Sequence, residues 1–399
     1  MKCAITVHIE GAVAMRSESQ QDLNSKNEQK MKRRQYRALK WTAAFLILAS
    51  LIVSIVMLCS VKKQMDTNPT HASFEPVKKS SGKCFTAPAE MGDRRVDKEK
   101  LTMMNYNAEW LFLNGGSGSM KCPSDKCPWK DKESAMRHFK NVVSQINKFN
   151  PDIIHLTEVE GCEMLSMLAE NLSAGYNYFL IPGGDTATGQ QVGLLTKIDP
   201  VIDLKFTKQR KAFPIPSSTC KADSGTTGVT KHYLTKFHVS GRDIVFVGAH
   251  LLAFPTRQDR CVRREAQAEV LRDFISENKK EKDEVVIMGD FNDFDSENLG
   301  TDSAKPVSQT LSILKNISEG CKLDNVMSKI PVNERYSNWH DVNRNCVDDG
   351  AKEHSLIDHI LMSPGLSKHI EKVQVLHNYD ASCGSEISDH WPVLVTLQF

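Results

Sequence analysis

The 399-residue sequence lacks an excess of either charge: 51 Lys and Arg residues stand against 49 Asp and Glu residues, and the formal net charge is +2. A chain without bulk positive charge is not expected to bind nucleic acid through charge alone. The sequence also lacks low-complexity composition and internal repeats at the usual periods, which excludes collagen-like, wholly disordered, solenoid and propeller proteins. What remains is a globular chain, long enough for two or three domains or for one large domain with appendages.

Charge is also missing locally, from residues 41–61, which contain no Asp, Glu, Lys, Arg or His. Residues 1–40 carry nine basic and four acidic residues, whereas residues 62–399 carry 42 basic and 45 acidic residues, a net charge of −3. The near-neutral total therefore combines a basic N-terminal segment with a slightly acidic remainder.

The uncharged segment reads WTAAFLILASLIVSIVMLCSV and predicts a transmembrane signal-anchor. As a helix, its 21 residues would extend roughly 31 Å, which matches the hydrocarbon core of a bilayer. Basic residues concentrate on its N-terminal side, at Lys30, Lys32, Arg33, Arg34, Arg37 and Lys40. The positive-inside rule then predicts a single-pass type II protein with a cytosolic tail (1–40) and residues 62–399 on the exoplasmic or luminal side. The alternative is a cleaved signal peptide and a secreted form.

Cysteine usage is typical of an exported domain, because nine of the eleven cysteines follow the apolar segment. In an oxidising compartment several should form disulfides, and the odd number leaves at least one unpaired or intermolecular. Cys122 and Cys127 lack a second closely spaced Cys/His pair, which favours a disulfide over a zinc site. The sequons at Asn171 and Asn316 are glycosylation acceptors in such a compartment.

After a polar stem (62–100), residues 101–399 are expected to form one α/β domain. Apolar residues at helical spacing predict helices that end before Asn150-Pro151 and that include Ala266 to Phe274. Because some strands follow one another without a helix, we expect mixed β-sheets. The predicted strands are 101–107, 152–157, 192–196, 232–237, 243–249, 284–289, 357–362 and 393–397.

Polar side chains stand at the ends of these strands, where a rigid scaffold can direct them into one cleft. They are carboxylates suited to a hard divalent cation, imidazoles suited to proton transfer, and amides that can bind oxyanions. This combination is typical of metal-assisted phosphate ester hydrolysis. The residues are Asn107, Glu158, His250, Asp290, Asn292, Asp358, Asp389 and His390.

The segments that hold these residues resemble the endonuclease/exonuclease/phosphatase superfamily, the fold of pancreatic-type deoxyribonucleases. The resemblance covers roughly residues 101–399, and GDFN and SDHWPV are its most specific elements. It implies a four-layer sandwich of two mixed β-sheets flanked by helices. The segments are MNYNAEWLF (104–112), IIHLTEVEG (153–161), VGAHL (247–251), IMGDFNDF (287–294), SLIDHILMS (355–363) and SDHWPV (388–393).

The resemblance also implies a metal site. Glu158 would coordinate Mg²⁺, and Asn107 and Asp389 would contribute to the same metal and phosphate environment. Mn²⁺ and Ca²⁺ are alternatives to Mg²⁺. Since Mg²⁺ usually takes only one or two carboxylates besides water and substrate phosphate, a small set of ligands is expected.

The remaining residues have catalytic roles in this resemblance. His390 would be the general base acting on water, oriented by Asp358. Asp290 and Asn292 would position the nucleophilic water and the phosphate oxygens, and His250 would contact the phosphate. An Asp that holds a His fixes its tautomer and raises its basicity, as in other base–orienter pairs.

The substrate expected from these motifs is DNA or RNA, because GDFND and SDHWPV look most like the nuclease branch. Two alternatives are a sphingomyelinase-type lipid phosphodiesterase and a noncatalytic ectodomain of the same fold. No protein partner is inferred. A basic patch at Arg257, Arg260, Arg263 and Arg264 could bind a phosphate backbone, or could be an ordinary solvated helix face.

Overall fold

The computed structural model describes residues 92–399, except residues 125–126, 174, 302–306, 319, 382 and 384. The predicted cytosolic tail (1–40), the signal-anchor (41–61) and residues 62–91 of the predicted stem lie outside the described residues. Within the described part, no helix is both long enough and apolar enough to cross a membrane.

The first sheet has six strands in the order β16-β17-β1-β2-β4-β3. β1 and β2 are parallel and the other neighbours are antiparallel, so the sheet is mixed, as predicted. Its strands are β1 (Lys100–Leu111), β2 (Ile153–Val159), β3 (Asn177–Phe179), β4 (Gln191–Thr196), β16 (Ile370–Val375) and β17 (Val393–Gln398).

The second sheet has five strands in the order β12-β15-β9-β8-β7. It is also mixed, because β8 and β9 are parallel whereas the other neighbours are antiparallel. Its strands are β7 (His232–Val239), β8 (Arg242–His250), β9 (Glu284–Asp290), β12 (Asp324–Asn325) and β15 (Asp358–Met362).

Helices and short two-stranded sheets complete the described part. The helices are α2 (Lys132–Phe149), α3 (Cys162–Asn171), α4 (Gln258–Asn278), α5 (Thr310–Lys315) and α6 (Pro364–Ser367), with short 3₁₀ turns at Val326–Lys329, Val332–Glu334 and Gly350–Lys352. The paired short strands are β5 (Lys211–Phe213) with β6 (Gly225–Thr227), β10 (Asn316–Ser318) with β11 (Cys321–Lys322), and β13 (Asn338–Trp339) with β14 (His354–Ser355).

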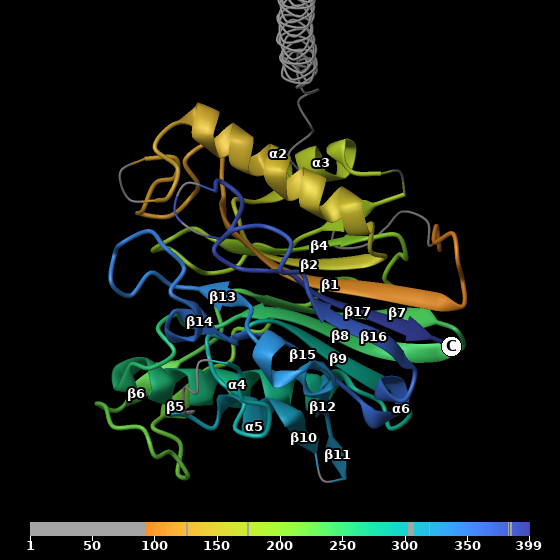
Figure 1. Ribbon diagram of the computed structural model, residues 1–399. Helices are drawn as coiled ribbons and strands as arrows, with labels where there is room; N and C mark the ends of the chain where they lie inside the picture. The colour runs from red at the N-terminus through yellow and green to blue at the C-terminus, as the bar shows by residue number, and fades with distance from the viewer. Residues whose placement is uncertain are drawn as a thin grey trace, which may run out of the picture. The chain divides into compact units, whose positions relative to one another are not determined.

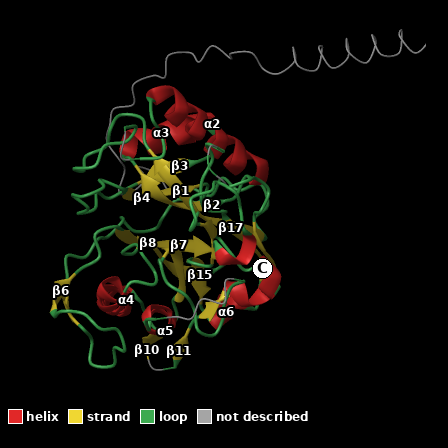
Figure 2. Cartoon of the chain, turned by 60° about the vertical axis from the view of Figure 1, so that its left-hand side comes forward, coloured by secondary structure: helices red, strands yellow, loops and turns green. Residues whose placement is uncertain are grey.

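These elements form four layers, with α2 and α3 over the first sheet and α4 and α5 over the second (Figures 1 and 2). Alternation along the strands sends Met103 and Met288 into the core between the two sheets, where they pack with Phe237. A second core joins α2 to the first sheet, and a third joins α4 to the second sheet. The sandwich expected from the sequence is therefore present in the described residues.

The longest helix over the first sheet illustrates how the sequence sets an element. Asp131 caps the first turn of α2 by accepting a hydrogen bond from the Ser134 backbone N–H at 2.8 Å. Phe139 and Ile146 lie on its buried face. The helix ends because Asn150 takes a left-handed conformation, with φ of 46°, directly before a proline. The end predicted at Asn150-Pro151 is confirmed.

Disulfides crosslink segments of the described part. The structure pairs Cys122 with Cys127, Cys220 with Cys261, and Cys346 with Cys383, and Cys162 is also disulfide-bonded. Cys321 is a free cysteine, as the odd number of cysteines predicted.

Candidate active site

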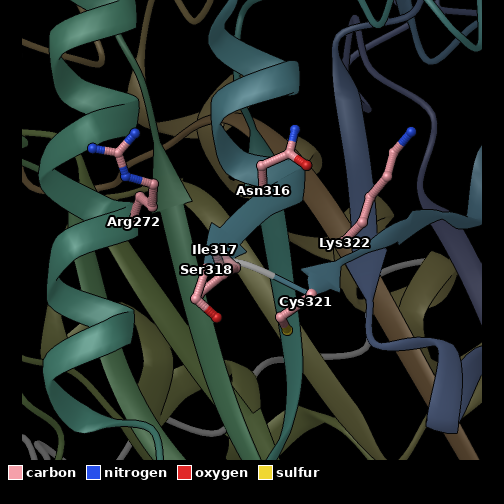
Figure 3. A pocket seen from close by; sticks show the side chains of 7 residues that line it. Arg272, Asn316, Ile317, Ser318, Cys321 and Lys322 are labelled. Carbon is pink, nitrogen blue, oxygen red and sulfur yellow. The ribbon is translucent and has the colours of Figure 1, made fainter.

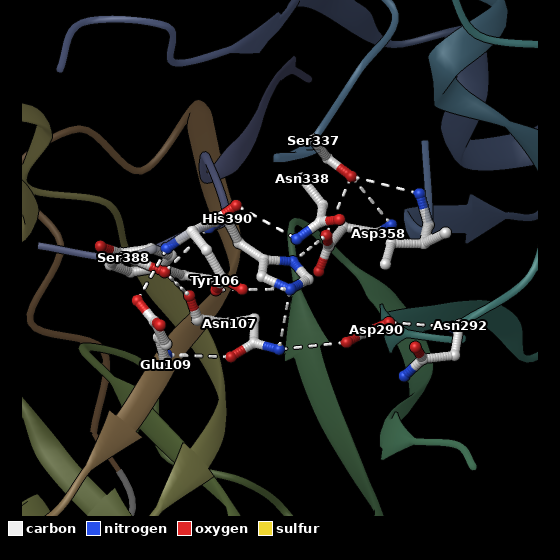
Figure 4. A network of polar contacts seen from close by, with 12 residues as sticks. Tyr106, Asn107, Glu109, Asp290, Asn292, Ser337, Asn338, Asp358, Ser388 and His390 are labelled. Atoms are coloured by element: carbon white, nitrogen blue, oxygen red, sulfur yellow. Dashed lines mark hydrogen bonds and ion pairs between the residues drawn. The ribbon is translucent and has the colours of Figure 1, made fainter. Parts of the chain in front are cut away.

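The polar residues predicted at strand ends meet at one end of the sandwich, where the two sheets come together. The Asn107 side chain, on β1 of the first sheet, donates through Nδ2 to Oδ2 of Asp290, on β9 of the second sheet, at 3.0 Å. The same nitrogen lies 3.4 Å from Oε1 of Glu158 and 3.4 Å from Nε2 of His390. Figure 4 shows the Asn107 amide between His390 and Asp290. The Asn107 amide on β1 therefore contacts groups on β2, on β9 and in the loop before β17.

Local backbone irregularities direct the carboxylates of the first sheet. The pairing of β1 with β2 shifts register between Asn107 and Leu111, and Glu109 and Trp110 have φ of 38° and 48° there. Glu158 also has a positive φ, 63°, where the pairing of β2 with β4 shifts. Bulges of this kind re-aim side chains next to active sites. Here the Trp110 N–H donates to Oε2 of Glu158 at 3.0 Å and fixes its carboxylate.

His390 and Asp358 form a hydrogen-bonded pair. Nδ1 of His390 lies 2.7 Å from Oδ2 of Asp358, and both side chains are buried. Ser337 holds the aspartate, because its hydroxyl donates to Oδ2 of Asp358 at 2.9 Å and accepts the Asp358 N–H at 3.0 Å. This arrangement leaves Nε2 of His390 facing Asn107 and the other carboxylates (Figure 4).

The segment that carries His390 is fixed on both sides by backbone hydrogen bonds. The Trp339 N–H donates to the Asp389 carbonyl at 2.8 Å, and the Trp391 N–H donates to the Ser337 carbonyl at 2.8 Å. The Ser388 hydroxyl donates to the Asn107 carbonyl at 2.9 Å and accepts the His390 N–H at 3.0 Å. These hydrogen bonds fix the position of His390, although it lies in a loop.

Asp290, Asn292 and His250 occupy the second-sheet side of the site. The Asn292 N–H donates to Oδ1 of Asp290 at 2.8 Å, and Asn292 has φ of 50°, a conformation that asparagine tolerates well. Nε2 of His250, at the end of β8, lies 3.6 Å from Oδ2 of Asp290. The parallel pairing of β8 with β9 places His250 opposite Asp290.

Burial and neighbouring charges shift the pKa values of these groups. Burial and the neighbouring Asp358 charge raise the pKa of Asp290 to about 7, and burial and Glu158 raise the pKa of Asp389 to about 6. Burial by itself lowers the pKa of His390, but the charges of Asp358 and Asp389 outweigh it and hold that pKa well above its usual range. Such shifts are typical of functional sites.

His250 is affected in the opposite direction. Burial and the nearby Lys231 ammonium hold the pKa of His250 well below its usual range. His250 is therefore neutral at physiological pH, and its imidazole can donate or accept a hydrogen bond without carrying charge.

The donor atoms suit a hard divalent cation. Oxygen and nitrogen atoms of Asp290, Asp358 and His390 lie within 4.8 Å of one another. Glu158 lies beside this group and raises the pKa values of Asp290 and Asp389, which shows that the carboxylates repel one another. A cation such as Mg²⁺ prefers oxygen ligands and would relieve this repulsion. Glu158 contacts Asn107 at 3.4 Å and Asp389 lies 3.8 Å from Nε2 of His390, so the carboxylates that the resemblance assigns to the metal adjoin this group and fit it.

All eight residues predicted from the sequence lie in this site. Two further residues, Glu109 and Ser337, also belong to it and were not predicted. Glu109 accepts the Asp389 N–H at 2.9 Å, and burial together with the charges of Asp389 and Glu158 raises its pKa well above the usual range. Ser337 supports Asp358 from the loop before β13. Glu109 lay inside the quoted segment 104–112 and could have been noticed, whereas Ser337 had no signal in the sequence.

Among the hollows of the described part, one borders the strand-end cluster and another lies apart from it. A hollow of about 780 Å³ borders the site, since Glu109 and Asp389 line it together with Trp129 and Trp339. A hollow of about 490 Å³ lies beside β10 and β11, and its lining includes Arg272 but none of the strand-end residues (Figure 3). The second hollow is therefore separate in composition from the candidate active site.

Comparison with known proteins bears on the same segment. A model described as the Endonuclease/Exonuclease/phosphatase family matches residues 114–390, which contain all of the predicted site residues except Asn107. No curated protein sequence matches the chain.

Among solved structures, several have a similar fold at low sequence identity. An AP endonuclease from Archaeoglobus fulgidus is 15% identical with a TM-score of 0.48, over 75% of this chain and 100% of that chain. D. rerio TDP2 complexed with single strand DNA product is 15% identical with a TM-score of 0.46, over 75% and 99% of the two chains. A mannosyl-6-phosphatase from Bacteroides thetaiotaomicron is 19% identical with a TM-score of 0.44, over 75% and 100%.

Proposed function

Because this chain belongs to the endonuclease/exonuclease/phosphatase family, we propose that it is a metal-dependent phosphodiesterase that hydrolyses nucleic acid. The observation that carries the proposal is the pair formed by His390 and Asp358, with 2.7 Å between Nδ1 and Oδ2, facing Asn107 and Asp290. A histidine held in this way can take a proton from water at its other ring nitrogen.

In the proposed mechanism, His390 accepts the proton of the attacking water at Nε2 while Asp358 holds Nδ1–H and stabilises the imidazolium that forms. Asp290 and Asn292 orient the water and the phosphate oxygens from the opposite side. His250, neutral because burial lowers its pKa, donates a hydrogen bond to the phosphate.

Glu158 and Asp389 are the proposed ligands of Mg²⁺, with Mn²⁺ and Ca²⁺ as alternatives. Asn107 belongs to the same environment, where its Nδ2 contacts Glu158 while its Oδ1 accepts the Glu109 N–H at 3.0 Å. When bound, the cation would neutralise charge on the carboxylates and on the phosphate, which lowers the pKa of His390 toward the range of a general base.

A noncatalytic ectodomain is disfavoured, because such a chain has no reason to keep Glu158, Asp290, Asp358 and His390 gathered around Asn107. Burial raises the pKa of Asp290, and the charges of Asp358 and Glu158 raise it further, so these carboxylates repel one another. Repelling buried groups are usually retained for function.

We also propose that the domain acts on the exoplasmic or luminal side of a membrane, anchored through residues 41–61. The basic flank before that segment and the disulfides Cys122–Cys127, Cys220–Cys261 and Cys346–Cys383 support this proposal. A protease on the outer face of sealed cells, or on the luminal face of vesicles, should cleave the domain, whereas a protease on the cytosolic face should not. Cleavage of the domain from the cytosolic face would refute the topology.

The substrate is tested by offering the full-length protein plasmid DNA, RNA and sphingomyelin vesicles with Mg²⁺, with and without EDTA. Hydrolysis of DNA or RNA that EDTA abolishes is the expected result. Hydrolysis of sphingomyelin alone, with both nucleic acids intact, would replace the nuclease with a lipid phosphodiesterase.

A further inference from the structure

An exposed aromatic side chain stands close to the candidate active site, on the loop that follows His250. Phe254 is 54% exposed and is the one aromatic among the exposed large hydrophobic residues of the described part. It is four residues from His250, so the two α-carbons lie within about 14 Å of each other. An exposed aromatic ring can stack on the bases of a nucleic acid.

Two guanidinium groups flank this ring. Cζ of Arg257 lies 5.4 Å from the centroid of the Phe254 ring, and Cζ of Arg260 lies 5.6 Å from it. Arg257 is also bound to Asp259, at 2.9 Å for both contacts. Residues 257–263 contain three arginines and one aspartate, so the segment keeps a net charge of +2. The exposed ring therefore lies in a locally cationic surface, on a chain that has little net charge overall.

The loop is held in place from inside the molecule. Arg264 is fully buried, and its guanidinium donates to the carbonyls of Leu252, Phe254 and Pro255 at 3.1, 3.0 and 2.7 Å. Nε of the same side chain donates to Asp293 at 2.9 Å. Arg264 is therefore a support for the loop and not part of a surface patch, which corrects its place in the basic patch considered from the sequence.

This support connects the loop to the site. Asp293 directly follows Asn292, and the Leu251 N–H donates to the Asp290 carbonyl at 3.0 Å. Phe254 itself has φ of 72°, a left-handed conformation that is uncommon for a bulky residue and that persists only where the surroundings impose it. The fold thus maintains an exposed ring in an unfavourable backbone conformation, on a loop that Arg264 ties to Asp293, the residue after Asn292.

We propose that Phe254, flanked by Arg257 and Arg260, is a stacking platform for an unpaired base of single-stranded nucleic acid, adjacent to the phosphodiester being cleaved. The inference rests on the proposed function and specifies its substrate class. Aromatic rings stack on bases of any sequence, guanidinium groups bind the backbone phosphates, and both contacts need bases that are free of a partner strand. A lipid surface is less suited to this loop, because a single exposed ring offers little apolar area for insertion.

The test compares three probes with the full-length protein: a short single-stranded oligonucleotide, its duplex, and a single strand of the same length made of abasic residues. Phe254→Ala should raise KM for the single strand about 5- to 150-fold, the range expected for loss of one base–aromatic contact, and leave kcat nearly unchanged. It should leave KM for the abasic strand and the duplex nearly unchanged. Phe254→Trp should retain binding, whereas Arg260→Gln should raise KM for the single strand and the abasic strand alike.

The matched control is Val332→Ala, which removes another exposed hydrophobic side chain, 56% exposed, from outside this loop. Dissociation constants for the same probes in EDTA separate this inference from the proposed function, because they need no hydrolysis. An unchanged affinity of Phe254→Ala for the single strand would overturn the platform even if the wild type is an active nuclease. Weaker binding of this variant to sphingomyelin vesicles, with unchanged binding to the single strand, would also overturn it and assign the loop to a lipid surface.

Discussion

At the scale of single residues, the proposed catalysis depends on Asp358 and its contact with His390. Asp358 accepts from His390 and from Ser337 at the same oxygen, Oδ2, while its Oδ1 is buried without a hydrogen-bond partner. The two hydrogen bonds at Oδ2 fix the carboxylate against the imidazole, whereas the unpartnered Oδ1 costs free energy. Asp358 is therefore expected to act through Oδ2 by holding the histidine.

Replacing Asp358 with Asn should test this. The amide retains the size of the side chain but no longer stabilises the imidazolium, so kcat for a phosphodiester in Mg²⁺ should fall by about 10²- to 10⁴-fold, the usual contribution of acid–base catalysis, with little change in KM. Ser337→Ala leaves the contact between Asp358 and His390 in place and should cost much less. Equal losses in the two variants would contradict the proposed roles.

The residues predicted from the sequence were those whose position follows from the local sequence pattern. Glu158, Asp290 and Asp358 lie at the ends of strands that appear as apolar runs, and Asn107 and His390 lie close to such runs, so the strand pattern indicates one end of the sheets for all five. Glu109 and Ser337 enter the site differently. Glu109 faces Asp389 only because β1 bulges, and Ser337 reaches Asp358 from a loop distant in sequence. Neither effect leaves a periodic signal.

At the scale of elements, long buried strands were predictable and half-exposed ones were not. The strands β4, β8 and β9 are buried along almost their whole length and appear as apolar runs. The strand β16 is mostly half-buried or exposed, and its sequence IEKVQV shows no such run. The strand β1 also continues past the predicted end at Asn107 to Leu111, because a bulge between these residues lets the strand resume its pairing with β2.

The parallel pair β8 and β9 also gives a prediction about close packing. A Cβ on Gly289 would lie 1.9 Å from the Ala249 carbonyl oxygen, and backbone cannot move aside as a flexible side chain can. Gly289→Ala should therefore destabilise the domain by about 1–3 kcal/mol or more and lower the unfolding temperature measured by calorimetry. Activity should fall with it, because these strands carry His250 and Asp290.

The matched control is Gly184→Ala. The nearest atom to a Cβ there is Cγ2 of Thr230 at 3.9 Å, an ordinary contact, so this variant should unfold close to the wild-type temperature. If Gly289→Ala is as stable as Gly184→Ala, the close approach of β8 and β9 is not as described.

At the scale of the whole molecule, buried histidines make stability depend on pH. His138 and His232 are fully buried, and burial lowers the pKa of each from 6.5 to about 4. The unfolded chain binds these protons at a higher pH than the folded chain does. The contribution of the two histidines to the free energy of unfolding is therefore complete above pH 6.5 and is lost as pH falls from 6.5 to about 4. Asp290 and Asp389 act in the opposite direction, because folding raises their pKa values.

A single variant isolates one part of this dependence. His138 contacts the Ala108 carbonyl at 2.7 Å through Nε2, and glutamine can donate to the same oxygen without titrating. Relative to His138→Gln, the wild type should lose on the order of 3 kcal/mol of unfolding free energy between pH 7 and pH 4, from urea denaturation. Parallel stability curves for the two proteins would show that His138 is not held neutral in the folded state.

In the proposed function, His390 and a divalent cation together hydrolyse a phosphodiester. The most direct measurement is the initial rate on a single-stranded oligonucleotide in Mg²⁺ for the full-length wild type, for His390→Ala, and for the control His238→Ala, whose side chain is 57% exposed. The wild type and the control should hydrolyse it, EDTA should stop them, added Mg²⁺ should restore them, and His390→Ala should be slower by about 10²- to 10⁴-fold. Hydrolysis that persists in EDTA, or a His390→Ala rate equal to that of the control, would contradict the account.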